Sequence, residues 1–269
     1  MNSTSAARLL VPLYVHPAVD PAAWQAVAAA GPERVRAVVL NVANGPGPEP
    51  DQAFVQAAAE LAGAGIPLLG YVDTGYGRRP HAEVVAEVLN HRQWYGTTGV
   101  YFDQAAAHQA ALAHYRRLTT AARAAGCELV VLGHGVHPEP SFAGHELGDV
   151  LVTFEGSWSE YDALVLPLWT GHHPAERFCH LVYGVPAERA EAAGALLASR
   201  RAGVGCAVPG SGTNPWSELP YGLGTADAPP APPAPQTPPA QLALVVPPPA
   251  ATGNPATPPS KPTHLECPQ

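Results

Sequence analysis

The sequence predicts a (β/α)₈ TIM barrel, and three observations support this prediction. Eight apolar runs of strand length recur within residues 7–222, and alanine-rich amphipathic stretches separate most of them. Such alternation is typical of parallel strands joined by helical crossovers. The runs are apolar nearly throughout, as in a sheet that is buried on both faces. The first run is followed by HPAVDP and not by the glycine-rich phosphate loop of an open doubly wound sheet, which favours a closed barrel.

The elements follow from this periodicity in chain order. The predicted strands lie at 7–15, 36–42, 66–73, 99–103, 128–134, 150–155, 179–184 and 203–208. The predicted helices lie at 20–30, 50–64, 81–95, 105–125 and 186–199. The chain of 269 residues is long enough for one barrel of typical size.

The composition changes sharply near Thr225. From residue 226 to residue 269 about one residue in three is proline, mixed with alanine and threonine and with almost no charge. Such a stretch buries too little apolar surface to offset the entropy of ordering it. The sequence therefore predicts a barrel over residues 1–225 and a disordered Pro/Ala-rich tail over 226–269, in which only QLALVV at 241–246 is apolar.

Charge and hydropathy exclude several classes of protein. A net charge of −8 argues against a nucleic-acid partner, since phosphate binding needs clustered Lys and Arg. No run of about 18 apolar residues exists that could span a membrane. The N-terminus as written lacks the pattern of a signal peptide, which predicts a cytoplasmic location unless export uses another route or the start lies elsewhere. The four widely spaced cysteines, without CxxC, predict buried thiols and one tail thiol.

Polar residues terminate nearly every predicted strand. Barrel enzymes carry their chemistry at the carboxyl ends of the strands, so closure should bring these side chains into one cleft. A lone aspartate at a strand end is more often a helix cap or turn residue, and Asp73, which precedes TGYG, fits that simpler interpretation. The residues at these ends are His16, Asn41, Asn44, Asp73, Asp103, Gln104, His134, Glu155 and Tyr183.

Two of these strand ends carry carboxylates after strongly apolar runs, GVYFD and VLVTFE. Asp103 and Glu155 would face each other across the barrel mouth, which is the minimum equipment for glycoside hydrolysis. Tyr76, Trp158 and Tyr161 are aromatic residues close to these ends that could stack on sugars or pack loops. From the residues alone, other barrel chemistries remain open.

Six motifs make the chain resemble the spherulin-4 family, in the family's order and over nearly all of the predicted barrel. They are LVPLYVHP (10–17), LNVANGPG (40–47), LGYVDTGYGRR (69–79), WYGTTGVYFDQ (94–104), VLVTFEGSWSEY (150–161) and NPWSELPYG (214–222). Enzymatically defined fungal members are endo-α-1,4-N-acetylgalactosaminidases that cut galactosaminogalactan, a biofilm polysaccharide. The resemblance implies a barrel with an acidic active site at Asp103 and Glu155. It also implies a cleft lined by Asp73, Tyr76 and Asn44.

The chain departs from the family pattern at two positions. Gln104 stands where the fungal enzymes carry a second carboxylate, and an amide can bind a sugar but cannot exchange a proton. The loop after the fifth strand reads GHGVHP where an Asn-Pro-Gly turn is expected, which would place His134 at the barrel mouth. We include Gln104 and His134 with Trp158 and Tyr183 among the expected sugar contacts.

The working hypothesis is hydrolysis within an α-linked amino-sugar polymer. Asp103 would act as nucleophile or charge stabiliser and Glu155 as general acid/base, or the two roles would be reversed. We expect burial between Phe154 and Trp158 to raise the pKa of Glu155 and keep it protonated near neutrality.

Two other interpretations stay open. A non-catalytic carbohydrate-binding or spore- and wall-associated barrel is favoured by Gln104 and by the missing signal peptide. A metal-dependent hydrolase is suggested by twelve histidines, but the sequence has no HxH ligand pair, so we predict no metal and no cofactor.

Overall fold

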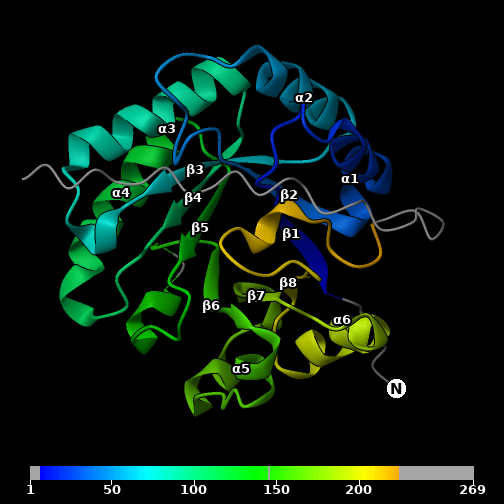
Figure 1. Cartoon of the computed structure of the whole chain (residues 1–269). Helices are drawn as coiled ribbons and strands as arrows, with labels where there is room; N and C mark the ends of the chain where they lie inside the picture. The colour runs from blue at the N-terminus through cyan, green and yellow to red at the C-terminus, as the bar shows by residue number, and fades with distance from the viewer. Residues whose placement is uncertain (1–6, 145, 224–269) are drawn as a thin grey trace, which may run out of the picture. The chain divides into compact units, whose positions relative to one another are not determined.

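The structure, a computed structural model, describes residues 7–144 and 146–223. Within these residues eight parallel strands pair in chain order and close into a barrel, which confirms the predicted fold class (Figure 1). The strands are β1 (Arg8–Pro12), β2 (Val35–Leu40), β3 (Leu68–Asp73), β4 (Gly99–Asp103), β5 (Leu129–Gly133), β6 (Val150–Ser157), β7 (Phe178–Tyr183) and β8 (Val204–Ala207).

The helices cover the barrel unevenly. They are α1 (Pro21–Arg34), α2 (Gln52–Gly63), α3 (His81–Tyr95), α4 (Leu112–Ala124), α5 (Trp158–Asp162) and α6 (Ala190–Ser199). Figure 1 shows the long helices α1 to α4 along one side, whereas β6 to β8 are flanked by short α5, by α6 and by loops. The connection from β5 to β6 holds only a 3₁₀ turn, Pro140–Ala143, and β8 is followed by another, Pro215–Ser217. The ring of helices is therefore complete on the β1–β5 side alone.

The predicted strands match the observed ones closely. The helices differ in two places: the stretch 105–125 is α-helical only from Leu112, after a 3₁₀ turn at Gln109–Ala111, and α5 was not predicted. Strand β4 and helix α3 have the predicted bounds. Strand β1 ends at Pro12 and not at residue 15, because Tyr14 leaves the sheet and its N–H donates to the carbonyl of Trp216 (2.9 Å). Helix α1 is broken at Gly31 (φ 70°, ψ 173°), next to Pro32, so its regular part ends where it was predicted to end.

Alternation along the strands divides the core into two layers. Leu69, Tyr101 and Val131 point into the barrel, whereas Phe102 and Leu132 point outward against the helices. Successive residues of a strand face opposite sides, so the inward set is known at each strand end once one member is known. Asp73 and Asp103 have the same parity as Tyr71 and Tyr101, and they therefore belong to the inner face.

Some predictions fall outside the described residues, namely the boundary near 225, the Pro/Ala-rich tail and the thiol of Cys267. The other three cysteines are buried and free, as predicted. No helix in the described part of the chain combines the length and apolar character needed to cross a membrane.

Candidate active site

Asp103 ends β4 on the inner face of the barrel, where residues of the two neighbouring strands, β3 and β5, contact its carboxylate. The hydroxyl of Tyr71 on β3 donates a hydrogen bond of 2.7 Å to Oδ2 of Asp103. On the other side stands Gly133 of β5, where a Cβ would lie 3.0 Å from Oδ1 of Asp103 and 2.8 Å from the hydroxyl of Tyr101. Glycine at this position leaves room for the carboxylate.

The environment of Asp103 contains opposing influences. Burial raises the pKa of Asp103, and the nearby charge of Asp73 adds to the rise. The hydrogen bond from Tyr71 lowers that pKa in part, since it stabilises the carboxylate form. The pKa of Tyr71 is itself raised, by burial and then by the charge of Asp103, so this phenol remains a donor across the working pH range.

Glu155 lies toward the end of β6, which is separated from β4 by β5 alone. The indole Nε1 of Trp216 donates to its Oε1 over 3.2 Å. Burial raises the pKa of Glu155 to about 7, Asp103 raises it further, and the Trp216 hydrogen bond opposes the rise. Water reaches this side chain through the cleft, while its other sides face the protein. With a pKa of about 7, Glu155 is partly protonated at neutral pH and mostly protonated at lower pH.

The raised pKa of Glu155 was expected from burial between Phe154 and Trp158, and that cause was wrong. Phe154 has the opposite parity on β6, and its ring packs on Tyr161 (4.9 Å between centroids) in a cluster outside the barrel. Trp158 also packs toward Tyr161 (6.4 Å). The pKa of Glu155 thus rises through enclosure in the barrel and through Asp103, and not through burial between Phe154 and Trp158.

Tyr14 lies close to both carboxylates, and sequence reasoning missed it. Burial raises its pKa well above the usual value, and the charges of Asp103 and Glu155 add to the rise. Its backbone is held by the segment after β8, since Asn214 Nδ2 donates to its carbonyl (2.9 Å). Counting in steps of two from Leu10, an inward residue of β1, would have found it.

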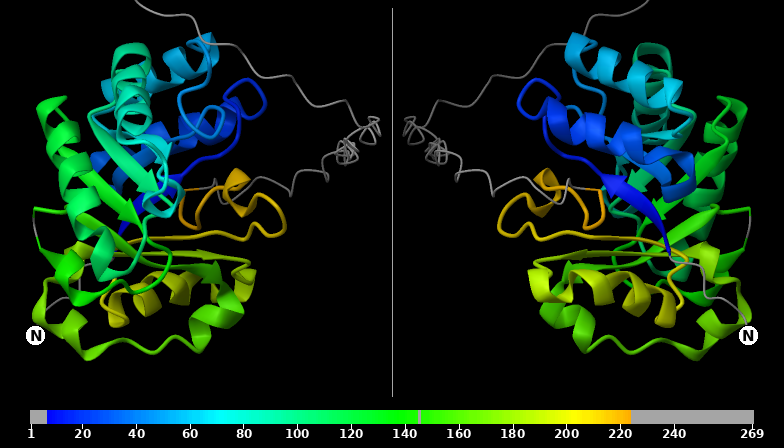
Figure 2. Two further views of the ribbon diagram at one scale, coloured as in Figure 1. Left: turned by 90° about the vertical axis from the view of Figure 1, so that its left-hand side faces the viewer. Right: turned by 90° about the vertical axis from the view of Figure 1, so that its right-hand side faces the viewer.

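An open cleft of about 740 Å³ is lined by Tyr14, Tyr71 and Glu155. Asp103 is not among the lining residues and adjoins the cleft through its hydrogen bond from Tyr71. The structure places two predicted contacts, Asn44 and Tyr183, in the lining of the cleft. Trp216 was not predicted, although it meets Tyr183 edge to face at 6.0 Å. Figure 2 shows the orange segment that carries Trp216 on the side of the barrel toward which the strand arrows point. The lining consists of Tyr14, Asn41, Val42, Ala43, Asn44, Tyr71, Glu155, Tyr183 and residues 212–216.

Asp73 combines the two roles that the sequence left open. Its Oδ1 accepts the N–H of Gly75 (2.6 Å), as a turn residue does. Its Oδ2 accepts the side-chain amide of Gln104 (3.2 Å), and Asp73 is the register partner of Asp103 across β3 and β4. Asp73 and Gln104 therefore lie beside the candidate catalytic aspartate, with the Gln104 amide already occupied.

Tyr76 lies in the loop after β3 and is not part of the cleft lining. Its side chain is 53% exposed, and its N–H donates to the carbonyl of Gln104 (2.8 Å). The structure thus ties Tyr76 to the end of β4 while leaving its ring in solvent.

His134 does not line the cleft, contrary to the prediction. On β5 the inward position is Gly133, so the next residue points outward, between the strands and the helices. The imidazole packs on Phe142 (4.8 Å), and its Nδ1 lies 3.1 Å from the carbonyl of Ala105. Burial lowers the pKa of His134 to about 4, so it is neutral and structural.

Trp158 also lies away from the carboxylates. It lines a separate hollow of about 470 Å³ together with residues such as Arg189 and Leu196. The reason is that Trp158 begins α5 after the last residues of β6, and this helix packs on the outside of the barrel.

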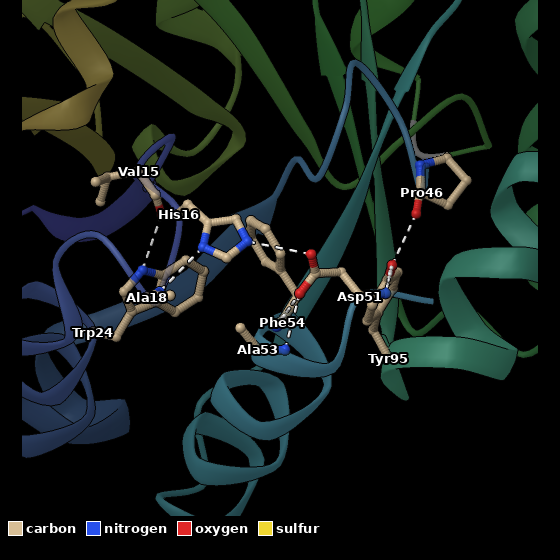
Figure 3. Close-up of polar contacts among 9 residues, drawn as sticks. All are labelled: Val15, His16, Ala18, Trp24, Pro46, Asp51, Ala53, Phe54 and Tyr95. Carbon is tan, nitrogen blue, oxygen red and sulfur yellow. Dashed lines mark hydrogen bonds and ion pairs between the residues drawn. The ribbon is translucent and has the colours of Figure 1, made fainter. Parts of the chain in front are cut away.

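His16 follows β1, contacts the start of α2 and is not part of the cleft lining. Figure 3 shows its Nε2 against Oδ2 of Asp51, 3.2 Å away, and its ring edge to face with Phe54. Asp51 in turn caps α2 by accepting the N–H of Ala53 (2.9 Å). His16 therefore has a structural role, since it contacts the residue that caps α2.

Other hollows and clusters lack the chemistry of a catalytic site. A groove of about 640 Å³ along α6 is lined mainly by alanine and leucine, including Ala193 and Leu197. In the part of the chain that the structure describes, no three His, Cys, Asp or Glu side chains are grouped to hold a metal ion. The cleft lined by Glu155, with Asp103 behind Tyr71, is thus the site that combines acids, aromatic rings and amides.

Comparisons with known proteins agree with this architecture. The family model of spherulation-specific family 4 (Spherulin4) matches residues 8–219, which include both carboxylates. Spherulin-4 of Physarum polycephalum is 30% identical over 162 residues, 59% of this chain and 47% of that protein, so the chain spans about half the length of this relative. The crystal structure of Aspergillus clavatus Sph3 in complex with GalNAc superposes with a TM-score of 0.69 at 25% identity, covering 81% of this chain and 94% of Sph3. The chain belongs to spherulation-specific family 4.

Proposed function

We propose that this protein is a glycoside hydrolase that cleaves a polysaccharide of α-1,4-linked N-acetylgalactosamine or galactosamine. The observation that carries the proposal is the pair of acids in contrasting environments. Asp103 accepts a hydrogen bond from a phenol, whereas Glu155 holds its proton to about pH 7. One stabilised carboxylate and one protonated acid are the two groups that glycoside hydrolysis requires. The likeness to a family member solved with GalNAc supports the choice of an amino sugar.

Each acid has one role in this mechanism. Glu155 donates its proton to the leaving glycosidic oxygen, so that the departing sugar leaves as a neutral alcohol. Asp103 presents its carboxylate to the anomeric carbon and stabilises the positive charge that develops there. A water molecule then adds to that carbon and gives up its proton to one of the two carboxylates, which completes the hydrolysis. Tyr71 keeps Asp103 oriented through the bond of 2.7 Å.

The lining of the cleft suits a sugar. Tyr14, Tyr183 and Trp216 offer apolar ring surface with polar edges, and Asn41 and Asn44 offer amides for hydroxyl or acetamido groups. Such a mixture of ring faces and a few placed polar groups is typical of small-molecule sites.

A specific observation favours a second candidate, a carbohydrate-binding barrel without catalysis. Gln104 is an amide beside Asp73 and Asp103, and an amide cannot exchange a proton. If turnover needed a third acid at this place, the cleft would bind sugars and leave them intact.

The test uses the full chain with oligomers of α-1,4-linked N-acetylgalactosamine and of galactosamine, with new reducing ends followed by mass spectrometry. Asp103→Asn and Glu155→Gln should each slow cleavage by at least about 100-fold. Glu33→Gln, an exposed acid at the end of α1, is the matched control and should leave it unchanged. Binding of the oligomers without any new reducing end would favour the second candidate, and unchanged cleavage in both variants would overturn the mechanism.

A further inference from the structure

A second hollow lies between α5 and α6, on the outside of the barrel. Its volume is about 470 Å³, and none of its lining residues belongs to the lining of the cleft. Figure 1 shows the two helices next to each other on the side of β6 to β8. The walls include Trp158 and Asp162 of α5, Leu196 and Ser199 of α6, and Arg189 just before α6. A hollow of this volume is within the range of small-molecule sites.

Helix α5 is anchored by Tyr161 and not by the tryptophan that faces the hollow. Tyr161 is fully buried, and its hydroxyl lies 2.9 Å from Nδ1 of His180. The guanidinium of Arg200 lies 4.5 Å from the centroid of the Tyr161 ring and donates to the carbonyl of Asp162 (2.9 Å). A capping box closes the start of the helix. The wall that carries Trp158 is therefore held in place by other side chains.

Three polar groups at the hollow have no partner within the fold. In the described part of the chain, no hydrogen bond or ion pair reaches the carboxylate of Asp162, the guanidinium of Arg189 or the indole N–H of Trp158. Asp162 and Arg189 are exposed, and Trp158 is half-buried. The hollow thus offers one acceptor group and two donor groups to a ligand.

The pattern of charges and rings selects a class of ligand. An anion would be attracted by Arg189 and repelled by Asp162, and a cation would meet the reverse. A neutral molecule that carries both donors and acceptors can use both groups. Trp158 and Leu196 add apolar surface beside them. A neutral pyranose fits this pattern, because its hydroxyl groups lie at the edge of the ring and its C–H groups on the face.

We propose that the hollow between α5 and α6 is a second sugar-binding site, which takes an N-acetylhexosamine unit outside the cleft. The Trp158 ring stacks on the sugar, Asp162 accepts hydrogen bonds from it, and Arg189 donates to it. Trp158 directly follows β6, and Arg189 lies in the connection that leaves β7, so both come from strand ends on the side of the cleft. This inference rests on the proposed function for its choice of sugar. It adds that the protein holds the polymer at a place where no bond is cut.

The test follows the indole N–H resonances of the full chain by NMR during titration with an α-1,4-linked N-acetylgalactosamine trisaccharide. The Glu155→Gln chain is used to prevent cleavage, and its amide oxygen can still accept from Trp216. Trp216 lines the cleft and Trp158 lines the hollow, so the two resonances report the two sites separately. Trp158→Phe and Trp216→Phe assign them. We expect both resonances to shift and to reach saturation.

A further variant separates binding in the hollow from an effect transmitted from the cleft. Asp162→Ala removes the acceptor at the hollow. We expect the dissociation constant followed at Trp158 to rise about threefold to tenfold, and the one followed at Trp216 to stay the same. Glu188→Ala removes a nearby exposed acid that is not in the lining, and as the matched control it should change neither constant.

The failure of this inference can be told apart from that of the proposed function. If the Trp216 resonance shifts and the Trp158 resonance stays, the second site alone is refuted. A Trp158 shift that Asp162→Ala does not weaken would also refute it, since the response would then originate in the cleft. A shift at Trp158 alone would support the second site and contradict the proposed function. If neither resonance shifts, both proposals fail.

Discussion

The two walls of the cleft position their acids by different means. On the β3–β4 wall, Asp103 is held by its neighbouring strand, where Tyr71 is fixed by sheet register. On the β6–β8 wall, Glu155 is held by Trp216, which comes from a loop 61 residues further along the chain. The first contact favours an anion, and enclosure at the second favours a protonated acid. Both partners lower the pKa of their acid, so the higher pKa of Glu155 follows from its burial and from the charge of Asp103, which outweigh the hydrogen bond from Trp216.

The outer layers repeat this difference. Long helices α3 and α4 pack behind β3 and β4, whereas short α5 and several 3₁₀ turns lie near β6 and β7 (Figure 1). The acid that accepts the hydrogen bond from Tyr71 thus lies on the more fully covered side. Four predictions test whether the two walls divide the chemistry in this way.

The largest effect is expected from Glu155→Gln, which keeps the shape of the side chain but cannot donate a proton to the leaving oxygen. We expect kcat to fall by about 10²–10⁴-fold, the usual contribution of a general acid. Steady-state kinetics with oligomers checks this. Substrates with very good leaving groups should lose much less, and an equal loss for both kinds would mean that Glu155 is not the acid.

Tyr71→Phe removes the hydrogen bond to Asp103 on the β3–β4 wall. The hydrogen bond from Tyr71 lowers the pKa of Asp103, so its removal should raise that pKa further. We expect kcat/KM to fall about tenfold, and its acidic limb to move to higher pH, because Asp103 must be ionised to act. An acidic limb that stays in place would assign that limb to another group.

Trp216→Phe alters the β6–β8 wall in the complementary way. The indole hydrogen bond lowers the pKa of Glu155, so its loss should move the alkaline limb of kcat/KM upward from about pH 7. The rate at the optimum should fall by only about threefold to fivefold. A shift of the acidic limb instead would show that the two walls are not separable.

The smallest effect concerns stability. The unfolded chain ionises Glu155 near its ordinary pKa of 4.5, whereas the folded chain holds the proton to about pH 7. The folded state binds more protons across this window, so the free energy of unfolding falls as the pH rises through it.

Glu155→Gln has no proton to lose, so it should remove this fall in the free energy of unfolding with rising pH. We expect a gain of about 1 kcal/mol at about pH 8, reduced because water screens this side chain, which corresponds to ~2–4 °C in Tm. At about pH 4 the gain should vanish, since both states then hold the proton. Thermal melts at the two pH values check this, and an equal gain at both would point to a packing effect.

The sequence alone located both acids. GVYFD and VLVTFE each bring a carboxylate toward a strand end, and parallel strands bring their carboxyl ends to one face, which predicted Asp103 and Glu155 on the same side of the barrel. The inward direction of Glu155 depends on a register shift between Val152 and Phe154, because Val152 points inward and strict alternation would turn Glu155 outward. Local chemistry also found Asn44 and Tyr183 in the cleft. These results depend on strand order and ends, which hydrophobic periodicity encodes locally.

His134 shows where this reasoning stopped. Successive residues of a strand alternate between the inner and the outer face, so a shift of one residue decides whether a strand-end side chain points inward. On β5 the inward position is Gly133, and because glycine has no side chain the sequence did not reveal that His134 points outward.

Only the tertiary structure decided the partners of the acids. Tyr14 and Trp216 reach the carboxylates because β1 lies beside β8 in the closed barrel, and their N–H and carbonyl groups join there. Contacts between residues some 200 positions apart leave no local pattern in a single sequence. The sequence determined which groups could carry the chemistry, and barrel closure determined which of them meet and how each is protonated.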